Sequence, residues 1–103
     1  EKVTELNLGD NQLTDVKGLE QLTQLTKLWL HNNRLTNVKG LKKLVKLVRI
    51  DLRYNQLTDV KGLEKLTQLK ELDLRYNPDL TKAQIDELQK ALPKCQIQSN
   101  PTK

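Results

Sequence analysis

Histidine and cysteine, the residue types most often used in catalysis and metal binding, are scarce in this sequence. His31 is the only histidine and Cys95 the only cysteine among the 103 residues. A histidine-based metal cluster or a catalytic triad needs more such groups than the chain has. The sequence also lacks a glycine-rich phosphate loop. We therefore expect no enzymatic activity, no cofactor and no metal site.

Two aspartates, Asp51 and Asp73, are the remaining candidates for acid–base or metal chemistry. Arginines surround both of them in the sequence: Arg49, Arg53 and Arg75. Ion pairing with these arginines explains the two carboxylates without a reaction, and we favour this interpretation.

A 22-residue repeat organises almost the whole chain and must position these side chains. The decapeptide NQLTDVKGLE occurs at residues 11–20 and again at residues 55–64, and residues 33–42 read NRLTNVKGLK. Writing each unit as LxxLxLxxNxL places the same residue types in the same positions: Val3, Leu25, Leu47 and Leu69 first; Leu6, Leu28, Ile50 and Leu72 fourth; Leu8, Leu30, Leu52 and Leu74 sixth; and Asn11, Asn33, Asn55 and Asn77 ninth. Such constancy predicts repeated structural units rather than an irregular core.

Each position in the unit has a physical reason. The LxL segment alternates with period two, so its leucines point inward from a short strand and their neighbours point outward. The asparagine turns the chain off the strand, and its amide can satisfy backbone groups at that corner. The segment around VKGL is too short for a full helix and predicts a 3₁₀ turn on the opposite side. The predicted fold is α/β: a right-handed solenoid with a short parallel sheet on its concave side, a 3₁₀ convex side and a C-terminal capping helix.

The pattern changes after Asn77. Thr81 and Gln84 have the spacing of a capping box, and Ile85, Leu88 and Leu92 share one helical face, so we expect a helix over residues 82–92. Beyond it, the residues Leu92, Cys95, Ile97 and Asn100 repeat LxxLxLxxN, which predicts a fifth strand and places the thiol in an inward position. The expected organisation is one domain over residues 1–103, with repeats at 3–24, 25–46, 47–68 and 69–91 and a degenerate strand and cap at 81–100.

The residues between the core positions carry the variation. All three aromatic side chains and three of the four arginines fall at outward positions of the predicted strands and of the turns after them. Tryptophan, tyrosine and arginine are the residue types that contribute most to protein interfaces. Cross-strand packing is the alternative, above all for the two tyrosines. The predicted binding residues are Lys27, Trp29, His31, Asn32, Arg49, Asp51, Arg53, Tyr54, Asp73, Arg75 and Tyr76.

The chain has a formal net charge of +5, but the residues that carry this excess positive charge do not lie on the predicted binding surface. The outward strand positions balance, and the excess comes from lysines of the predicted convex side and the C-terminus. Residues 42–46 form the densest lysine cluster but hold no aromatic side chain, so we do not expect a nucleic-acid partner. We expect no membrane span, because no apolar stretch is long enough, and no signal peptide is evident. The chain is therefore expected to be soluble, either cytoplasmic or secreted.

These motifs resemble the leucine-rich-repeat family, and within it the 22-residue class that includes internalins and the leucine-rich regulatory subunit of type-1 protein phosphatase. The similarity covers residues 3–100. It implies a protein-recognition module without enzymatic activity. The chain differs from internalins in lacking an N-terminal helical cap, while its closing helix resembles those of bacterial repeat proteins. The identical decapeptides are typical of recent duplication or of a consensus or engineered sequence.

The predicted function is binding of a protein or peptide through the concave face. Two alternatives remain open: a structural unit that self-associates edge to edge through its uncapped first turn, and a fragment or scaffold without a partner of its own. Nothing before Val3 covers the apolar side of that turn, so upstream residues or a partner cover it, or it is exposed.

Overall fold

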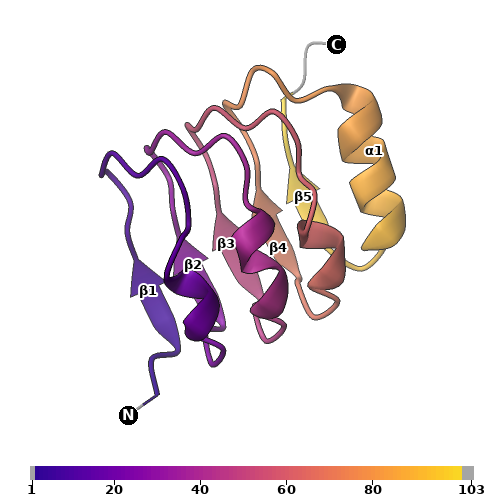
Figure 1. The fold of residues 1–103 in the computed structure, drawn as a ribbon. Helices are drawn as coiled ribbons and strands as arrows, with labels where there is room; N and C mark the ends of the chain where they lie inside the picture. Colours follow the sequence, from indigo (N-terminus) through magenta and orange to yellow (C-terminus); the bar gives the residue numbers. More distant parts are fainter. Residues whose placement is uncertain (1, 101–103) are drawn as a thin grey trace.

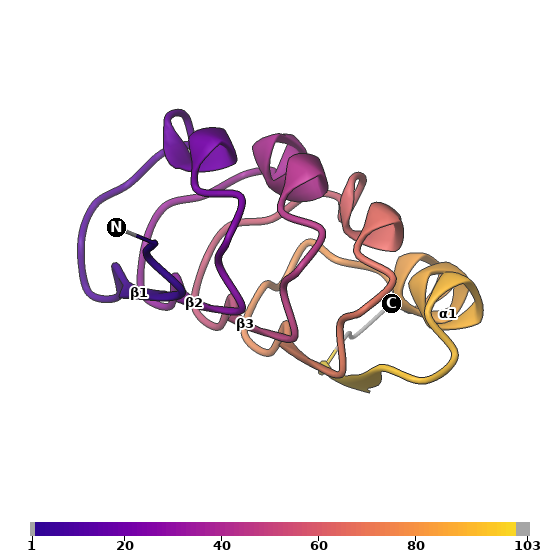
Figure 2. The ribbon, with the colours of Figure 1, turned by 90° about the horizontal axis from the view of Figure 1, so that it is seen from below.

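A computed structural model describes residues 2–100 and shows a short, curved solenoid. Five parallel strands pair in chain order along one side: β1 (Glu5–Asn7), β2 (Lys27–Trp29), β3 (Arg49–Asp51), β4 (Glu71–Asp73) and β5 (Gln96–Gln98). Three 3₁₀ turns cover the opposite side: η1 (Leu19–Gln21), η2 (Lys39–Lys43) and η3 (Leu63–Lys65). The helix α1 (Lys82–Ala91) continues that row at the C-terminal end (Figures 1 and 2).

The strand register confirms the repeat. Glu5 pairs with Lys27, Lys27 with Arg49, and Arg49 with Glu71, so each of the first four strands is displaced from the next by one 22-residue unit. The repeated leucines consequently stack into one core that lies between the sheet and the 3₁₀ turns. Its fully buried members include Leu25, Leu28, Leu30, Leu35, Leu41, Leu44, Leu47, Ile50, Leu52, Leu57, Leu63 and Leu66.

Three of the four repeated asparagines, Asn33, Asn55 and Asn77, form a buried ladder beside this core. The side-chain amide of Asn55 donates to the carbonyl oxygens of Leu30 and Leu52, both at 3.0–3.1 Å, and its side-chain oxygen accepts from the backbone N–H of Leu35 at 3.0 Å. Asn33 and Asn77 make the same three contacts one unit earlier and later. Each of these asparagines therefore satisfies backbone groups at its own corner, as predicted, and also ties its turn to the preceding one.

The C-terminal helix has the predicted start. The Thr81 hydroxyl accepts from the backbone N–H of Gln84 at 3.1 Å, and the Gln84 side chain accepts from the N–H of Thr81 at 2.9 Å. This reciprocal pair satisfies two donors that the first helical turn leaves free. The helix ends at Ala91 with Leu92 as its C-cap, one residue earlier than expected. Ile85 and Leu88 face the core, and α1 covers its C-terminal end.

The predicted alignment of the fifth strand is wrong by two residues. Ile97 pairs with Leu72, the fourth position of its unit, whereas the motif placed Ile97 in the sixth position. The structure also gives Asn100 another role: its side-chain oxygen accepts from the N–H of Tyr76 at 2.8 Å. Because side chains alternate along a strand, a slip of two residues keeps the same residues inward. The sequence pattern could not distinguish the two registers for this reason.

Cys95 lies inward, as predicted, but just before β5. Burial raises the pKa of its thiol to about 11, and the negative charge of Glu71 adds to the shift. The thiol is thus protonated at neutral pH and acts as a small apolar side chain.

Candidate functional site

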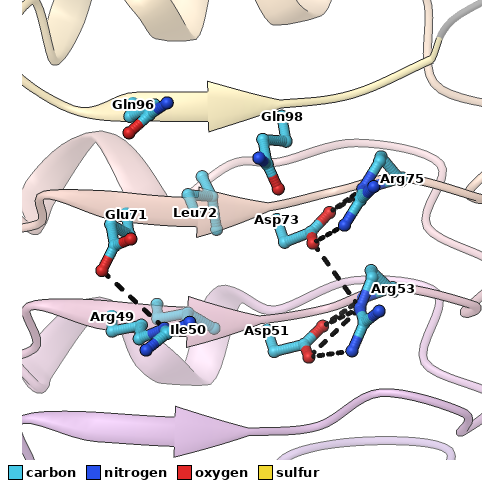
Figure 3. A pocket seen from close by; sticks show the side chains of 10 residues that line it. All are labelled: Arg49, Ile50, Asp51, Arg53, Glu71, Leu72, Asp73, Arg75, Gln96 and Gln98. Atoms are coloured by element: carbon cyan, nitrogen blue, oxygen red, sulfur yellow. Dashed lines mark hydrogen bonds and ion pairs between the residues drawn. The ribbon is translucent and has the colours of Figure 1, made fainter.

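The outward side chains form three rows across the concave face. These rows come from the third, fifth and seventh positions of each unit, which Arg49, Asp51 and Arg53 occupy in the third unit. Where β3, β4 and β5 meet, these rows enclose a depression of about 240 Å³ (Figure 3). Its floor and walls are made by Arg49, Ile50, Asp51, Arg53, Glu71, Leu72, Asp73, Arg75, Gln96 and Gln98. The lining is mostly charged, which suits a polar ligand rather than an apolar one.

A row of alternating charges runs through this depression. The carboxylate of Asp51 binds the Arg53 guanidinium through two donors, with Oδ2 to Nη2 at 2.8 Å and Oδ1 to Nε at 3.0 Å. Asp73 binds Arg75 in the same way at 2.7 and 2.9 Å. The Nε of Arg53 also lies 3.5 Å from Oδ2 of Asp73, which joins the two pairs. Figure 3 shows this row along the ends of β3 and β4.

The structure supports charge compensation of the two aspartates, with one correction. Arg53 and Arg75 contact them, whereas Arg49 pairs with Glu71 at 3.8 Å in the neighbouring row. Arg49 is displaced because it belongs to the third position of its unit and Asp51 to the fifth, so their side chains stand in different rows of the same strand.

Asp51 is buried, with 8% of its surface exposed, and it is ionised. Burial alone would raise the pKa of this carboxyl group. The hydrogen bonds from the side chain and backbone of Arg53, the charge of Arg53 and that of His31 outweigh burial and hold the pKa below its ordinary value. The ion pair therefore stabilises the fold.

Replacement of Asp51 by asparagine should make the fold less stable in a pH-dependent way. Because the pKa of Asp51 is lowered on folding, its contribution is complete above the unfolded value of about 3.9 and disappears as the pH falls through the folded value. Urea unfolding should show a loss of about 1–2 kcal/mol at pH 7 and a much smaller loss at pH 2–3. Asp86→Asn, at an exposed pair with Lys82, is the control and should change little. An equal loss for Asp51→Asn at both pH values would contradict the prediction.

His31 is less exposed than a surface contact residue was expected to be. Its imidazole lies against Gly9, where a Cβ atom would collide with the ring. The Nδ1 atom is buried without a hydrogen-bond partner in the described part of the chain and lies 3.6 Å from Asp51 Oδ2, while Nε2 lies 3.8 Å from Asp10 Oδ2. The ring packs between two carboxylates because the preceding unit has glycine at the equivalent position. His31 thus lies beside the ion-pair row, with 20% of its side chain exposed.

Tyr54 and Tyr76 stand at the rim of the concave face and stack on each other. Their ring centroids are 4.4 Å apart and the ring planes differ by 7°. Both residues have a positive φ, 58° and 64°, as do Asp10 and Asn32 at the equivalent position of the earlier units. This left-handed turn carries the chain off each strand and directs the side chains outward, so each tyrosine keeps 47% of its surface exposed. The cross-strand packing that was one interpretation of the two tyrosines is therefore present, and both residues remain exposed.

The remaining predicted residues lie on the β2 side, away from the depression. Trp29 is half-buried between Asn7 and Asp51 in the register of the sheet. The ammonium group of Lys27 lies 3.8 Å from the Glu5 carboxylate. The Asn32 amide donates to Asp10 at 2.7 Å. The structure thus separates the predicted set into a β3–β5 group and a β2 group.

Sequence reasoning missed Gln96 and Gln98, which line the depression from β5. Both flank Ile97, and this alternation of polar and apolar residues was a signal that they point outward. Among residues 2–100, the structure brings no three histidine, cysteine, aspartate or glutamate side chains together as metal ligands would be.

Comparison with known proteins agrees with this geometry. A family model described as leucine-rich repeats (two copies) matches residues 1–43 and 45–93. The chain belongs to the leucine-rich-repeat family. Proteins of this family commonly serve as protein-interaction modules and are generally not enzymes. Among curated proteins, none matches the sequence significantly.

Solved structures of bacterial leucine-rich-repeat proteins are similar to the chain over nearly all of its length. An internalin (inlF) of Listeria monocytogenes has a TM-score of 0.86 and 30% identity over 98% of this chain. A leucine-rich-repeat protein of Leptospira interrogans has a TM-score of 0.83 and 37% identity over 92% of this chain. Internalin C2 of Listeria monocytogenes has a TM-score of 0.84 and 26% identity over 98% of this chain. The chain spans 30%, 25% and 45% of the lengths of these three proteins, respectively.

Within the described region of this leucine-rich-repeat chain, no helix combines the length and apolar character needed to cross a bilayer.

Proposed function

We propose that the chain binds another protein or a peptide through the concave face of its sheet. The observation that carries this proposal is the contrast between the two faces of each strand. Inward positions repeat almost without change from unit to unit, because each must fill the same space. The outward positions vary along the chain, although the third and fourth units share aspartate, arginine and tyrosine at the fifth, seventh and eighth positions, and they hold the tryptophan, both tyrosines and three of the four arginines.

The contact residues of this proposal are Trp29, Arg53, Tyr54, Arg75 and Tyr76. The stacked tyrosines expose apolar ring surface in a fixed orientation, so little entropy is lost when a partner covers them. The arginines are held by carboxylates and keep free N–H donors beside that surface. Rigid aromatic groups next to oriented donors are characteristic of residues that dominate binding energy.

The size of the face supports a small partner. Five strands about 4.8 Å apart give a surface about 19 Å wide. With strands of three residues, this area is well below the roughly 800 Å² per partner of a standard interface. A peptide or one loop of a protein would cover the face, and a larger partner would also contact the tyrosine rim.

The test is a triple concave variant, Trp29→Ala with Arg53→Ala and Tyr54→Ala. Proteins captured by the wild-type chain are identified, purified and titrated by calorimetry against each variant. The concave variant should bind more weakly by more than about 1 kcal/mol, because truncation of a dominant contact costs at least this much. Its circular dichroism spectrum should remain that of the folded protein.

A matched control changes three residues far from the sheet: Lys42→Ala and Lys43→Ala in η2, with the exposed Val45→Ala. This variant should bind as the wild type does. Unchanged affinity of the concave variant, or an equal loss in both variants, would overturn the proposal. Light scattering over a range of concentrations tests the alternative of edge-to-edge self-association, which predicts a mass that rises with concentration.

A further inference from the structure

The alternating charges of the concave face follow a rule in the β3–β4 region. Arg53 contacts two carboxylates, that of Asp51 in its own unit at 2.8 Å and that of Asp73 in the next unit at 3.5 Å. Asp73 likewise lies between two guanidinium groups, those of Arg53 and Arg75. A charge in the middle of the row therefore has an opposite charge on both sides.

The rule is broken at β5. The sheet register places Gln98 next to Asp73, where a third carboxylate would continue the row. Over residues 2–100, Arg75 has an ion pair with Asp73 alone, and no hydrogen bond forms from the side-chain amide of Gln98 or of Gln96. Arg75 is thus the end of the row and has a carboxylate on one side only. Figure 3 shows Gln98 above Asp73, on the open side of the row.

Arg75 has donors left for a second acceptor. A guanidinium group has five N–H donors, and the pair with Asp73 uses Nε and Nη2. Within residues 2–100 the Nη1 atom has no hydrogen-bond partner, and 39% of the side chain is exposed. The primary amide of Gln98 supplies two further donors one strand away. Charge-assisted hydrogen bonds from a guanidinium group to an anionic oxygen are about twice as strong as hydrogen bonds between neutral groups.

The charges that line the depression balance, so the site has no excess positive charge to hold a dianion. Three guanidinium groups and three carboxylates line the depression, namely Arg49, Arg53 and Arg75 with Asp51, Glu71 and Asp73. A carboxylate that approaches from the β5 side meets Arg75 and Gln98 first. A dianion such as phosphate would also meet stronger repulsion from Glu71 and Asp73.

We infer that the β4–β5 end of the depression is a binding site for an aspartate or glutamate side chain of the partner, which takes the place that a carboxylate at position 98 would hold and completes the charge row at Arg75. This inference rests on the proposed function of the concave face and specifies the chemistry of one contact within it.

The test uses the whole chain with isotope-labelled arginine side chains, observed by NMR. The probes are N-acetylglutamate N-methylamide and its neutral match, N-acetylglutamine N-methylamide. The acidic probe should shift the Arg75 side-chain signals saturably and more than those of Arg49 and Arg53, and the neutral probe should not. No saturable Arg75 shift, or equal shifts of all three arginines, would overturn the inference. A larger response to inorganic phosphate than to the acidic probe would refute the assignment to a carboxylate.

Two isosteric variants on the same strand provide an internal control. Gln98→Glu supplies the missing carboxylate, so it should abolish the Arg75 response to the probe and raise or preserve the urea midpoint. Gln96→Glu adds the same charge beside Glu71, without an arginine left to pair, so it should retain the response and lower the midpoint. Retained probe binding by Gln98→Glu would overturn the inference. If the concave triple variant loses its partner while Arg75 fails to respond, only the carboxylate site is refuted and the proposed function stands.

Discussion

Replacement of Asn55 by alanine is expected to lower the free energy of unfolding by about 3 kcal/mol. The N–H of Leu35 loses the side-chain oxygen that accepts from it, and this donor is buried. The carbonyl oxygens of Leu30 and Leu52 each lose one of two donors and keep the other, from Asn33 and Asn77. An unsatisfied buried donor costs about 1–3 kcal/mol, and each lost hydrogen bond adds about 1 kcal/mol. Urea unfolding followed by circular dichroism measures the loss.

The same substitution at Asn11 is the matched control. Asn11 occupies the equivalent position of the first unit, but it is exposed, and its amide donates only to the carbonyl oxygens of Leu8 and Gly9. Water can replace these contacts, so Asn11→Ala should cost less than about 1 kcal/mol. Equal losses for the two variants would show that the ladder does not stabilise the solenoid through burial.

Replacement of Leu52 by alanine should destabilise the fold by about 3–4 kcal/mol. Leu52 is fully buried at the sixth position of the third unit, with the equivalent leucines Leu30 and Leu74 in the adjacent units. Removal of its side chain loses the transfer energy of the apolar atoms and leaves a cavity that neighbours on both sides hold open. A loss of this size is a large part of the 5–15 kcal/mol that holds an ordinary domain together.

Leu8→Ala removes the same atoms from the same position of the first unit, where the leucine is only partly buried. The expected loss is about half as large, because less apolar surface returns to water. Denaturant midpoints of the two variants, measured in parallel, test the difference. A larger loss at Leu8 than at Leu52 would contradict the packing that the structure describes.

The repeating part of the fold could be predicted from the sequence because the solenoid is built from local rules. A leucine in LxL must point inward whatever its neighbours are, and the asparagine that follows must satisfy the same backbone groups in every unit. A period of 22 residues then sets the register of β1 to β4 without further information. The C-terminal helix could also be predicted from the sequence, because its capping box is a contact between residues that are three apart.

The contacts between outward side chains could be predicted only in part, because they depend on which side chains the register places side by side. Arg49 and Arg53 each lie two residues from Asp51 in the sequence, yet only Arg53 contacts its carboxylate. His31 is partly buried because the preceding unit has a glycine at the equivalent position, and a single repeat does not contain this information.

The chain's sequence alone determined the family, the inward leucines and the surface on which variation collects, because a repeated unit imposes the same burial on each copy. The tertiary structure decided the register of β5 and, with it, the row of charges that stops at Arg75. A slip of two residues leaves the inward pattern of a strand unchanged but moves every outward neighbour. The core pattern therefore carries no information about this register, and only the path of the chain through α1 sets it.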